Sequence, residues 1–201
     1  QVGSVRDLLG LIGIQARYSA AEAFPEGLRV PLEEAILSFL YDHAVAEPAV
    51  QRGRDDEASS LLLYASEILA GQIFPDHIFP GTGQTGTWHR ERGEQAAMAW
   101  LRTRAAGGFA AWDSGCTFAE VIAALVHLVE LVGSDDLFEM ATAVLDKTLY
   151  SLALNSFKGS FGSTHGVAEV PELLHGMLDA TSGISRLMWG AGAFNSETTG
   201  Y

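Results

Sequence analysis

One stretch of the chain gathers many of the side chains that could take part in chemistry. From Asn155 to Gly166 the sequence reads Asn-Ser-Phe-Lys-Gly-Ser-Phe-Gly-Ser-Thr-His-Gly. Glycine permits positive φ angles and close backbone approach, while Ser, Thr and Asn suit shaped, non-repetitive loops. His165 is the one side chain here that exchanges a proton near neutral pH. We therefore interpret His165 as an acid/base or ligand residue, with the cap of a helix end as the alternative.

Two further side chains have types and positions that suit a binding site. Trp112 lies in a predicted loop, and a flat apolar ring of this kind matches the C–H face of a pyranose; alternatively it plugs the loop onto the helices. His89 stands at the start of a predicted helix, where it either faces a cleft or lies on the surface of the first turn. His127 falls on an apolar helix face and is interpreted as a core histidine.

The sequence predicts neither a metal site nor a cofactor. Its six histidines show no His-x3-His or His-Glu-x2-His spacing. The single Cys116 excludes an internal disulfide and a cysteine-built zinc site, and leaves the compartment open. The run from Gly81 to Gly86 resembles a phosphate-binding loop only superficially, because the Lys-Ser/Thr ending and a preceding strand are missing.

The acidic charge argues against nucleic acid and anionic membranes as partners, and the length limits the number of domains. The 201 residues carry 12 Lys and Arg against 25 Asp and Glu, a net charge of -13. This acidic balance argues against nucleic-acid binding and against attraction to an anionic membrane surface. Polar residues interrupt each apolar run before the roughly 18 residues that a membrane span needs. The length fits a single domain with one core.

The elements that must position these side chains are helical. Apolar residues recur with helical spacing, and the longest helices are expected at about 55–71, 88–106, 117–132 and 135–154. A Thr-x-x-Glu pattern at Thr117 predicts a capping box that opens the third of these. No two-residue alternation bounded by hairpin turns occurs, so we predict an all-α fold. Long helices joined by short breaks and long loops favour antiparallel hairpins whose long loops gather at one end.

Three passages resemble a known group of proteins when they are taken together with their spacing. They read Leu-Ala-Gly-Gln-Ile-Phe-Pro-Asp from Leu69, Gly-Gly-Phe-Ala-Ala-Trp-Asp-Ser from Gly107, and Ala-Leu-Asn-Ser-Phe-Lys-Gly running on to Gly166 from Ala153. The chain resembles, from about Glu57 to Asn195, a bacterial group of large proteins allied to heparinase II/III and alginate-lyase-type enzymes.

The resemblance implies a fold and a class of partner. The related catalytic portions are (α/α) toroids of about a dozen helices, and 201 residues hold roughly seven or eight. We therefore expect one helical domain over residues 1–201 that forms an incomplete, toroid-like arc of antiparallel helical hairpins. Flanking helices and further domains would belong to a longer chain. The implied partner is a polysaccharide or oligosaccharide.

The resemblance also implies a chemistry, β-elimination from a uronic acid. In such enzymes a Tyr or His removes the C5 proton and protonates the leaving oxygen. Here the positions that match the family's Glu-Asn-His read Glu57-Ala58-Ser59, and the Tyr residues expected beyond Trp112 are missing. The catalytic set is therefore thinned, and the catalytic residues that we expect are His165, Glu57 and His89.

We expect the saccharide site to lie where the loops 72–87, 107–116 and 155–166 meet. Its predicted substrate-binding residues are Trp112, Asn155, Ser163 and Gln72. Two alternatives remain open. The missing Asn-His pair and Tyr favour a non-catalytic helical module that binds a saccharide or another protein. A hydrolase of related shape would instead need two carboxylates facing each other, and Glu57 with Asp113 is the pair available for it.

Overall fold

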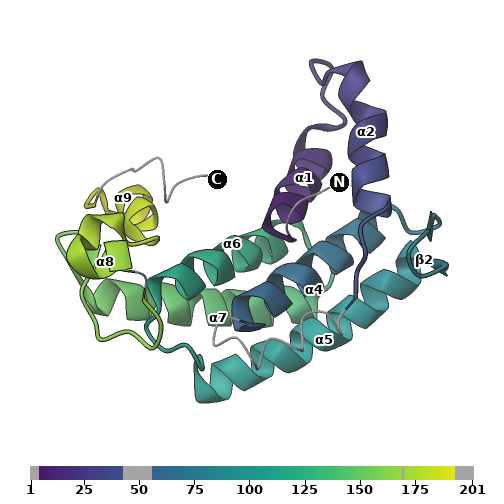
Figure 1. Cartoon of the computed structure of the whole chain (residues 1–201). Coiled ribbons are helices and arrows are strands. Elements are labelled where there is room, and N and C mark those ends of the chain that lie inside the picture. Colours follow the sequence, from purple (N-terminus) through teal and green to yellow (C-terminus); the bar gives the residue numbers. More distant parts are fainter. Residues whose placement is uncertain (1–4, 43–55, 169, 193–201) are drawn as a thin grey trace.

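Four long helices form the body of the protein in a computed structural model, which describes residues 5–42, 56–168 and 170–192 (Figure 1). The prediction of an all-α fold is confirmed, since the strands among the described residues are limited to two-residue pairs. The helices of the described part are α1 (Val5–Tyr18), α2 (Glu26–Leu37), α4 (Asp56–Ile73), α5 (Gly86–Gly107), α6 (Gly115–Leu131), α7 (Asp135–Leu154), α8 (Val170–Leu174), the 3-10 turn η2 (Gly176–Leu178) and α9 (Ser182–Trp189).

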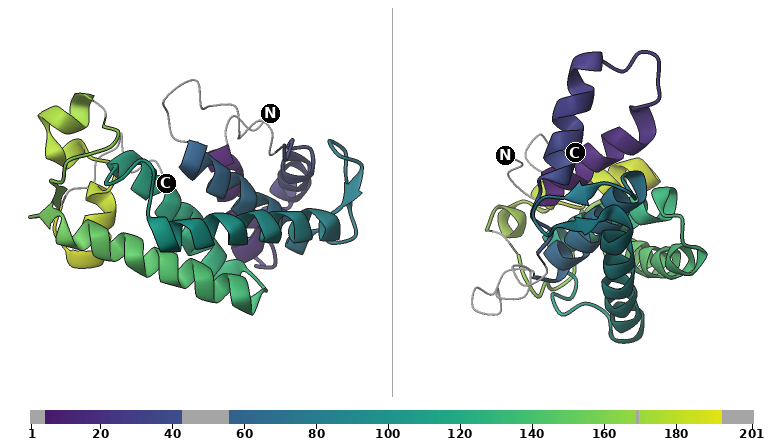
Figure 2. Two further views of the ribbon diagram at one scale, coloured as in Figure 1. Left: turned by 90° about the horizontal axis from the view of Figure 1, so that it is seen from below. Right: turned by 90° about the vertical axis from the view of Figure 1, so that its right-hand side faces the viewer.

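The long helices pack as two antiparallel hairpins in two layers. The hairpin α4/α5 lies against the hairpin α6/α7, with α4 packed on α6 and α5 packed on α7. Helix α1 packs on α4 and α6 and so extends the first layer, while α2 runs back beside α1 towards the helical body (Figures 1 and 2). The four long helices match the sequence expectations to within about two residues at nearly every end.

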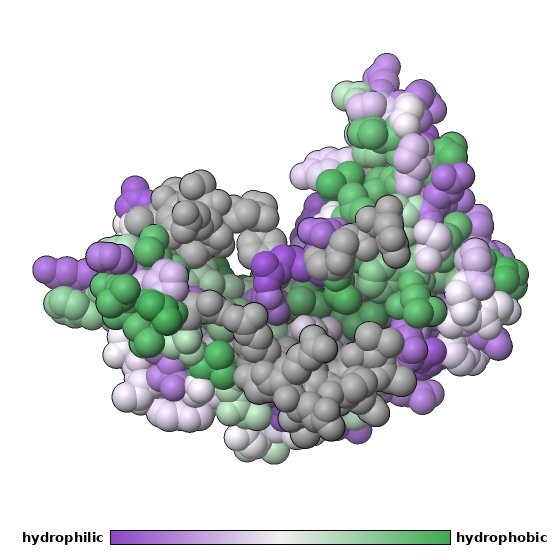
Figure 3. Space-filling view, viewed as in Figure 1, coloured by the Kyte–Doolittle hydropathy of each residue, from purple (hydrophilic) through white to green (hydrophobic). Residues whose placement is uncertain are grey.

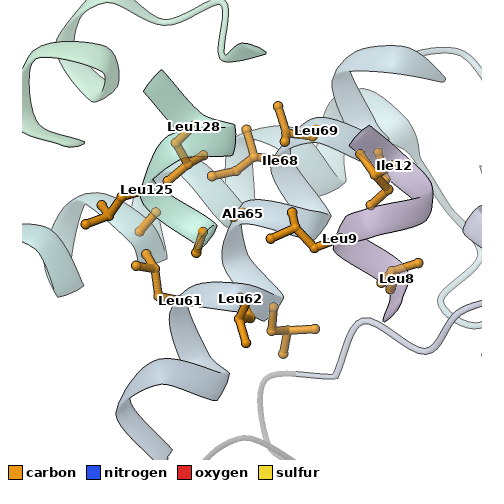
Figure 4. Packing of buried hydrophobic residues seen from close by; sticks show 14 of the residues in the cluster. Leu8, Leu9, Ile12, Leu61, Leu62, Ala65, Ile68, Leu69, Leu125 and Leu128 are labelled. Carbon is orange, nitrogen blue, oxygen red and sulfur yellow. The ribbon is translucent and has the colours of Figure 1, made fainter. Parts of the chain in front are cut away.

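Helix α4 lies at the centre of the core because it is apolar on more than one face. Leu61, Ala65 and Ile68 are fully buried, and their spacing of three and four residues places them on one side of the helix. The neighbouring positions contact other helices, so that α4 is covered by both α1 and α6 (Figure 4). Apolar side chains labelled on α4 and on the helices around it are Leu8, Leu9, Ile12, Leu62, Leu69, Leu125 and Leu128 (Figure 4).

Two glycines let the end of α4 approach the start of α5 closely. A Cβ added at Gly86 would lie 2.0 Å from the carbonyl oxygen of Phe74, and one at Gly71 would lie 2.3 Å from the carbonyl oxygen of Gly86. Both contacts are with backbone atoms, which a side-chain movement cannot relieve. The turn from α4 to α5 therefore depends on the missing side chains.

The connectors alternate between the two ends of the helices. Residues 74–85, which contain the paired strands β1 (Ile78–Phe79) and β2 (Gln84–Thr85), lie at the same end as residues 132–134. The Gln72 side chain joins them, donating from Nε2 to the carbonyl oxygen of Leu131 at 2.8 Å and accepting from Gly133 N at 2.8 Å. We call this the His89 end.

At the opposite end, residues 108–114 meet residues 155–168, which contain the paired strands β3 (Ser156–Phe157) and β4 (Ser160–Phe161). The backbone N–H of Gly166 donates to the Trp112 carbonyl oxygen at 2.8 Å. We call this the His165 end. The prediction that the loop 72–87 shares this end is wrong, because successive antiparallel helices place successive connectors at opposite ends (Figure 1).

The predicted capping box at Thr117 is also wrong. Helix α6 begins earlier, with Ser114 in the N-cap position, and Thr117 lies one turn inside as a fully buried residue. The carboxylate of Asp179, from the segment before α9, instead lies against Gly115, where an added Cβ would be 2.1 Å from Oδ2. A carboxylate at this place complements the positive end of the helix.

The C-terminal elements β4, η2 and α9 pack together as a small group at the His165 end. Phe118, Ile122, Leu152 and Phe161 make an apolar cluster beneath β4, and α9 and η2 pack against that strand. Apolar side chains remain exposed on α8 and α9, and the molecular surface is hollowed between these helices and the α1–α2 projection (Figure 3). No helix of the described chain has both the length and the apolar character needed to cross a membrane.

Candidate functional site

Asp113 is the residue around which the His165 end is organised. Its backbone has φ of 49°, a left-handed conformation that L-residues other than Asn and Asp rarely adopt. Its carboxylate accepts from Ser163 Oγ at 2.7 Å and from Ser151 Oγ at 3.2 Å. A strained backbone held in place by its surroundings is typical of functional sites. Asp113 thereby connects the connector 108–114 to α7 and to the loop that carries His165.

The same residue fixes the ring of His165. The Nδ1 atom of His165 lies 2.5 Å from the Asp113 carbonyl oxygen, which can only accept a hydrogen bond, so that Nδ1 carries the proton. On the other side the ring packs on Phe161, with 5.4 Å between ring centroids. In the neutral ring, Nε2 is then the atom with a free lone pair. No described side chain hydrogen-bonds to it, and His165 is only half-buried.

Trp112 extends into solvent beside this histidine. Its side chain is 51% exposed. Gly166 packs against it so closely that an added Cβ would lie 3.1 Å from the backbone N and O of Trp112. The exposure favours the interpretation of Trp112 as a binding platform over that of a plug, because a plug would bury the ring.

Asn155 and Ser163 are also at this end, but their side chains are engaged within the protein. Asn155 Nδ2 donates to the Ser151 carbonyl oxygen at 3.0 Å, and the Asn155 carbonyl oxygen accepts from Gly162 N at 2.9 Å. Ser163 donates to Asp113, as described above. Both residues therefore hold the loop of His165 in shape. We call Trp112, Asp113, Ser163 and His165 the polar site.

Glu57 supports the polar site from beneath. Its carboxylate accepts from the backbone N–H groups of Ala110 at 3.0 Å and Ala111 at 3.2 Å, and it forms an ion pair with Arg104. The residue is 7% exposed. These contacts fix the loop just before Trp112 and occupy both carboxylate oxygens. The geometry gives Glu57 a positioning role instead of the catalytic role that the resemblance implies.

His89 and Gln72 lie at the other end of the helices. His89 is fully buried between Glu67 and Thr82, and Gln72 is bonded to the turn between α6 and α7. The expectation that these residues join His165 in one site is therefore wrong, because the connector that follows α4 and the connector that follows α5 lie at opposite ends of the helices. Both members of the nominated hydrolase pair are engaged within the protein, Glu57 by backbone N–H groups and Asp113 by serine hydroxyls.

Sequence reasoning missed Glu67 altogether and treated Thr82 only as part of a superficial phosphate-loop pattern. A signal for Glu67 was present, since it is an acidic residue within the apolar run of α4 and is 0% exposed. A buried carboxylate requires a partner, and His89 provides it.

A groove of about 370 Å³ lies outside the polar site and reaches the His89 end at Ser134. It runs between α5 and the start of α7, and it is lined by Glu94, Gln95, Met98, Ala99, Arg102, Ser134, Asp136 and Leu137. None of the sequence-predicted site residues lines it, and its charges are mixed. We therefore base the functional argument on the polar site, where strain, exposure and a fixed histidine coincide.

The described residues contain no group of three or more His, Cys, Asp or Glu side chains placed to hold a metal ion. Searches against protein-family models, curated proteins and solved structures found no match to this chain.

Proposed function

We propose that this chain is a carbohydrate-active helical domain allied to heparinase II/III-type and alginate-lyase-type polysaccharide lyases, and that the polar site contacts the saccharide. The observation that carries the proposal is the exposed ring of Trp112 in the same loop contact as a half-buried histidine whose Nδ1 is fixed and whose Nε2 no described side chain hydrogen-bonds. A sugar ring presents an apolar C–H face and, around its rim, hydroxyl groups. The Trp112 ring provides for the first and His165 Nε2 for the second.

The helical arrangement supports the toroid part of the proposal. Two hairpins stack side by side, with α4 and α6 in one layer and α5 and α7 in the other, and α1 continues the first layer. Repetition of such a hairpin unit generates an (α/α) arc. Exposed apolar side chains on α8 and α9, among them Leu174 and Leu187, fit an arc whose edge is covered by further helices.

Binding can be tested by calorimetry with oligosaccharides from alginate and from glycosaminoglycans. We expect Trp112→Ala to weaken the affinity at least tenfold, since stacked aromatic contacts contribute about 0.5–1.5 kcal/mol beyond the area that they bury. Trp88→Ala is the matched control, because Trp88 is also exposed, at 38%, but lies at the opposite end. Equal affinities of wild type and Trp112→Ala, with the fold retained in circular dichroism, would contradict the proposal.

The tautomer of His165 favours a second candidate function, lyase turnover. In β-elimination, His165 Nε2 would take the C5 proton of a uronic acid, the bond from C4 to the leaving oxygen would break, and the same proton would pass to that oxygen. The polar site has no second titratable side chain free for this work, since Asp113 is occupied by two hydroxyls. His165 would therefore act as both base and acid.

An absorbance assay for the new C4–C5 double bond tests this second candidate with the same oligosaccharides. Turnover that falls about 10²–10⁴-fold in His165→Ala would support it. Saccharide binding with no turnover would instead identify a non-catalytic saccharide-binding module, and turnover unaffected by His165→Ala would remove the catalytic role of that residue.

A further inference from the structure

The His89 end holds a second histidine in a different setting. His89 lies in the first turn of α5, and its Nδ1 is 2.6 Å from Oε1 of Glu67 on α4. Both side chains are 0% exposed. Rings of Tyr41, Phe79 and Trp88 surround the imidazole, with centroids 5.6, 4.5 and 5.0 Å from that of His89. The pair is thus excluded from water on these sides.

The partners of Glu67 indicate that it accepts hydrogen bonds as a carboxylate. Arg92 Nε lies 3.6 Å from the same Oε1 atom, and a guanidinium can only donate. Arg92 is itself held by donation to the Tyr41 carbonyl oxygen at 2.8 Å. With an anionic acceptor on one side, the His89 ring carries its proton on Nδ1, and Nε2 faces away from Glu67.

Nε2 of His89 meets the hydroxyl of Thr82, with 2.7 Å between Nε2 and Oγ1. The backbone N–H of Gln84 donates to the same Oγ1 at 3.3 Å. Since Oγ1 already accepts this bond, its own proton has Nε2 as its acceptor. The order carboxylate, imidazole, hydroxyl, with each pair within hydrogen-bond reach, is the arrangement that activates a hydroxyl nucleophile.

Unlike its two buried partners, Thr82 reaches the surface. It is half-buried in the turn between β1 and β2, and it is followed by Gly83, whose φ is 70° and beside which a Cβ would meet no atom within 4 Å. No atom therefore obstructs the surface at Gly83, the residue next to Thr82. Exposed apolar side chains border the turn, with Leu40 Cδ1 3.3 Å from the Cβ position of Gly81.

We propose that Glu67, His89 and Thr82 form an acyl-transfer site whose nucleophile is Thr82 and whose substrate class is a small, uncharged acyl ester. The apolar border at Leu40 and the net charge of -13 disfavour an anionic substrate. The inference stands apart from the saccharide site, because none of its three residues contacts the polar site.

The reaction balances with water as the only co-reactant. Thr82 Oγ1 forms a bond to the ester carbonyl carbon while its proton passes to His89 Nε2. The tetrahedral intermediate then loses the alkoxide, which takes that proton, and the acyl group stays on Thr82. A water molecule attacks the acyl-threonine, gives a proton to Nε2 and releases the carboxylic acid, with the proton returning to Thr82 Oγ1. Glu67 keeps the ring oriented throughout.

p-Nitrophenyl acetate is a suitable probe, since release of p-nitrophenolate is followed by its absorbance and the acetyl group is located by peptide mass mapping. We expect acetylation of the full chain at Thr82. Thr82→Val, which keeps the shape and removes the hydroxyl, should lower nitrophenolate release at least tenfold. Thr103→Val is the matched control, because that threonine is exposed on α5 and bonds only to Ala99, and we expect its rate to equal that of wild type.

The conservative variant Thr82→Ser separates a nucleophile from a structural hydrogen-bond partner. It retains the hydroxyl, so acetylation at position 82 should persist even if Thr82→Val does not fold. Acetyl groups found only on lysines in the folded wild-type protein would overturn the proposal, as would equal rates of Thr82→Val and wild type.

Discussion

The two ends of the helical body use the same side chain in opposite ways. His89 and His165 are each fixed through Nδ1, the first by the Glu67 carboxylate and the second by the Asp113 carbonyl oxygen. They differ at Nε2, which meets the Thr82 hydroxyl in one case and no described side chain in the other. His89 is fully buried, whereas His165 lies beside the exposed Trp112.

This difference shows that burial decides what a fixed histidine can act on. A buried imidazole takes part in a reaction only where the protein brings a reacting group to it, and the Thr82 hydroxyl is such a group. A half-exposed imidazole can meet an external molecule, which is why we propose the His165 end as the saccharide site. The ends should accordingly differ in how strongly substitutions affect stability.

The largest expected effect is that of Glu67→Ala. Removing the carboxylate leaves the buried Nδ1–H of His89 without an acceptor and a cavity in the core, at a cost of about 3–5 kcal/mol in the free energy of unfolding. Urea denaturation followed by circular dichroism measures this loss in the free energy of unfolding.

Two variants serve as comparisons for Glu67→Ala. His165→Ala should cost only about 1 kcal/mol, the contribution of one hydrogen bond. Glu130→Ala, which breaks an exposed ion pair with Arg17, should cost less still. Equal losses for Glu67→Ala and His165→Ala would remove the contrast between the ends.

Gly86→Ala tests the close approach of α4 and α5 at the His89 end. The added Cβ would meet the Phe74 carbonyl oxygen at 2.0 Å, so we expect a loss of about 3 kcal/mol in the free energy of unfolding. Gly107→Ala, at the other end of α5, is the control, because no atom lies within 4 Å of its Cβ position. It should leave the stability unchanged or raise it by about 0.5–1 kcal/mol. A stable Gly86→Ala protein would mean that this turn can relax.

A smaller effect is expected from Asp113 at the His165 end. Asp113→Ala removes the acceptor of two serine hydroxyls and keeps the left-handed backbone, and should cost about 2 kcal/mol. Asp113→Gly relieves the backbone and should cost about 1 kcal/mol less. Hydrogen exchange should show faster opening of residues 163–166 in both variants, while the amides of α4 stay protected. Unchanged exchange there would mean that Asp113 does not hold the loop.

The smallest effect concerns His127, which belongs to neither end. Burial lowers its pKa, and its hydrogen bond to Ala123 opposes this only partly; the nearby Arg17 lowers it further while Glu130 raises it. Because the unfolded chain binds the proton more readily, stability should be complete above the ordinary pKa of about 6.5 and should fall as the pH drops below it. Thermal unfolding between pH 7.5 and 5 measures this, and His127→Leu should flatten that part of the profile. If His127→Leu had the same dependence of stability on pH as the wild type, His127 would not be the source of this dependence.

The sequence was sufficient for the helices because their signals are local. The apolar spacing of Leu61, Ala65 and Ile68 and the helix stop at Gly107 both predict what the structure contains. The predicted helix start at Thr117 was wrong. Threonine favours N-cap positions, but this threonine is buried one turn inside α6. The Asp179 carboxylate at the start of α6 comes from a segment more than sixty residues away, beyond any local pattern.

The candidate site was predictable only in part, for a related reason. Trp112, Ser163 and His165 do meet, because the connectors after α5 and after α7 share an end. His89 and Gln72 were misplaced since their connector follows α4, and a count of helix reversals would have separated them. The partners of His89 needed three dimensions, because Glu67 and Thr82 approach it from another helix and from a hairpin turn.

The carboxamide of Gln72 has a consequence for how the two hairpins can move. It donates to Leu131 and accepts from Gly133, as a peptide group of a neighbouring strand would. Sliding α4 along α6 by one helical turn, about 5.4 Å, would break both bonds at once. The two hydrogen bonds of Gln72 thus set the register of one hairpin along the other. The distance between the hairpins is set by the apolar side chains that pack between them.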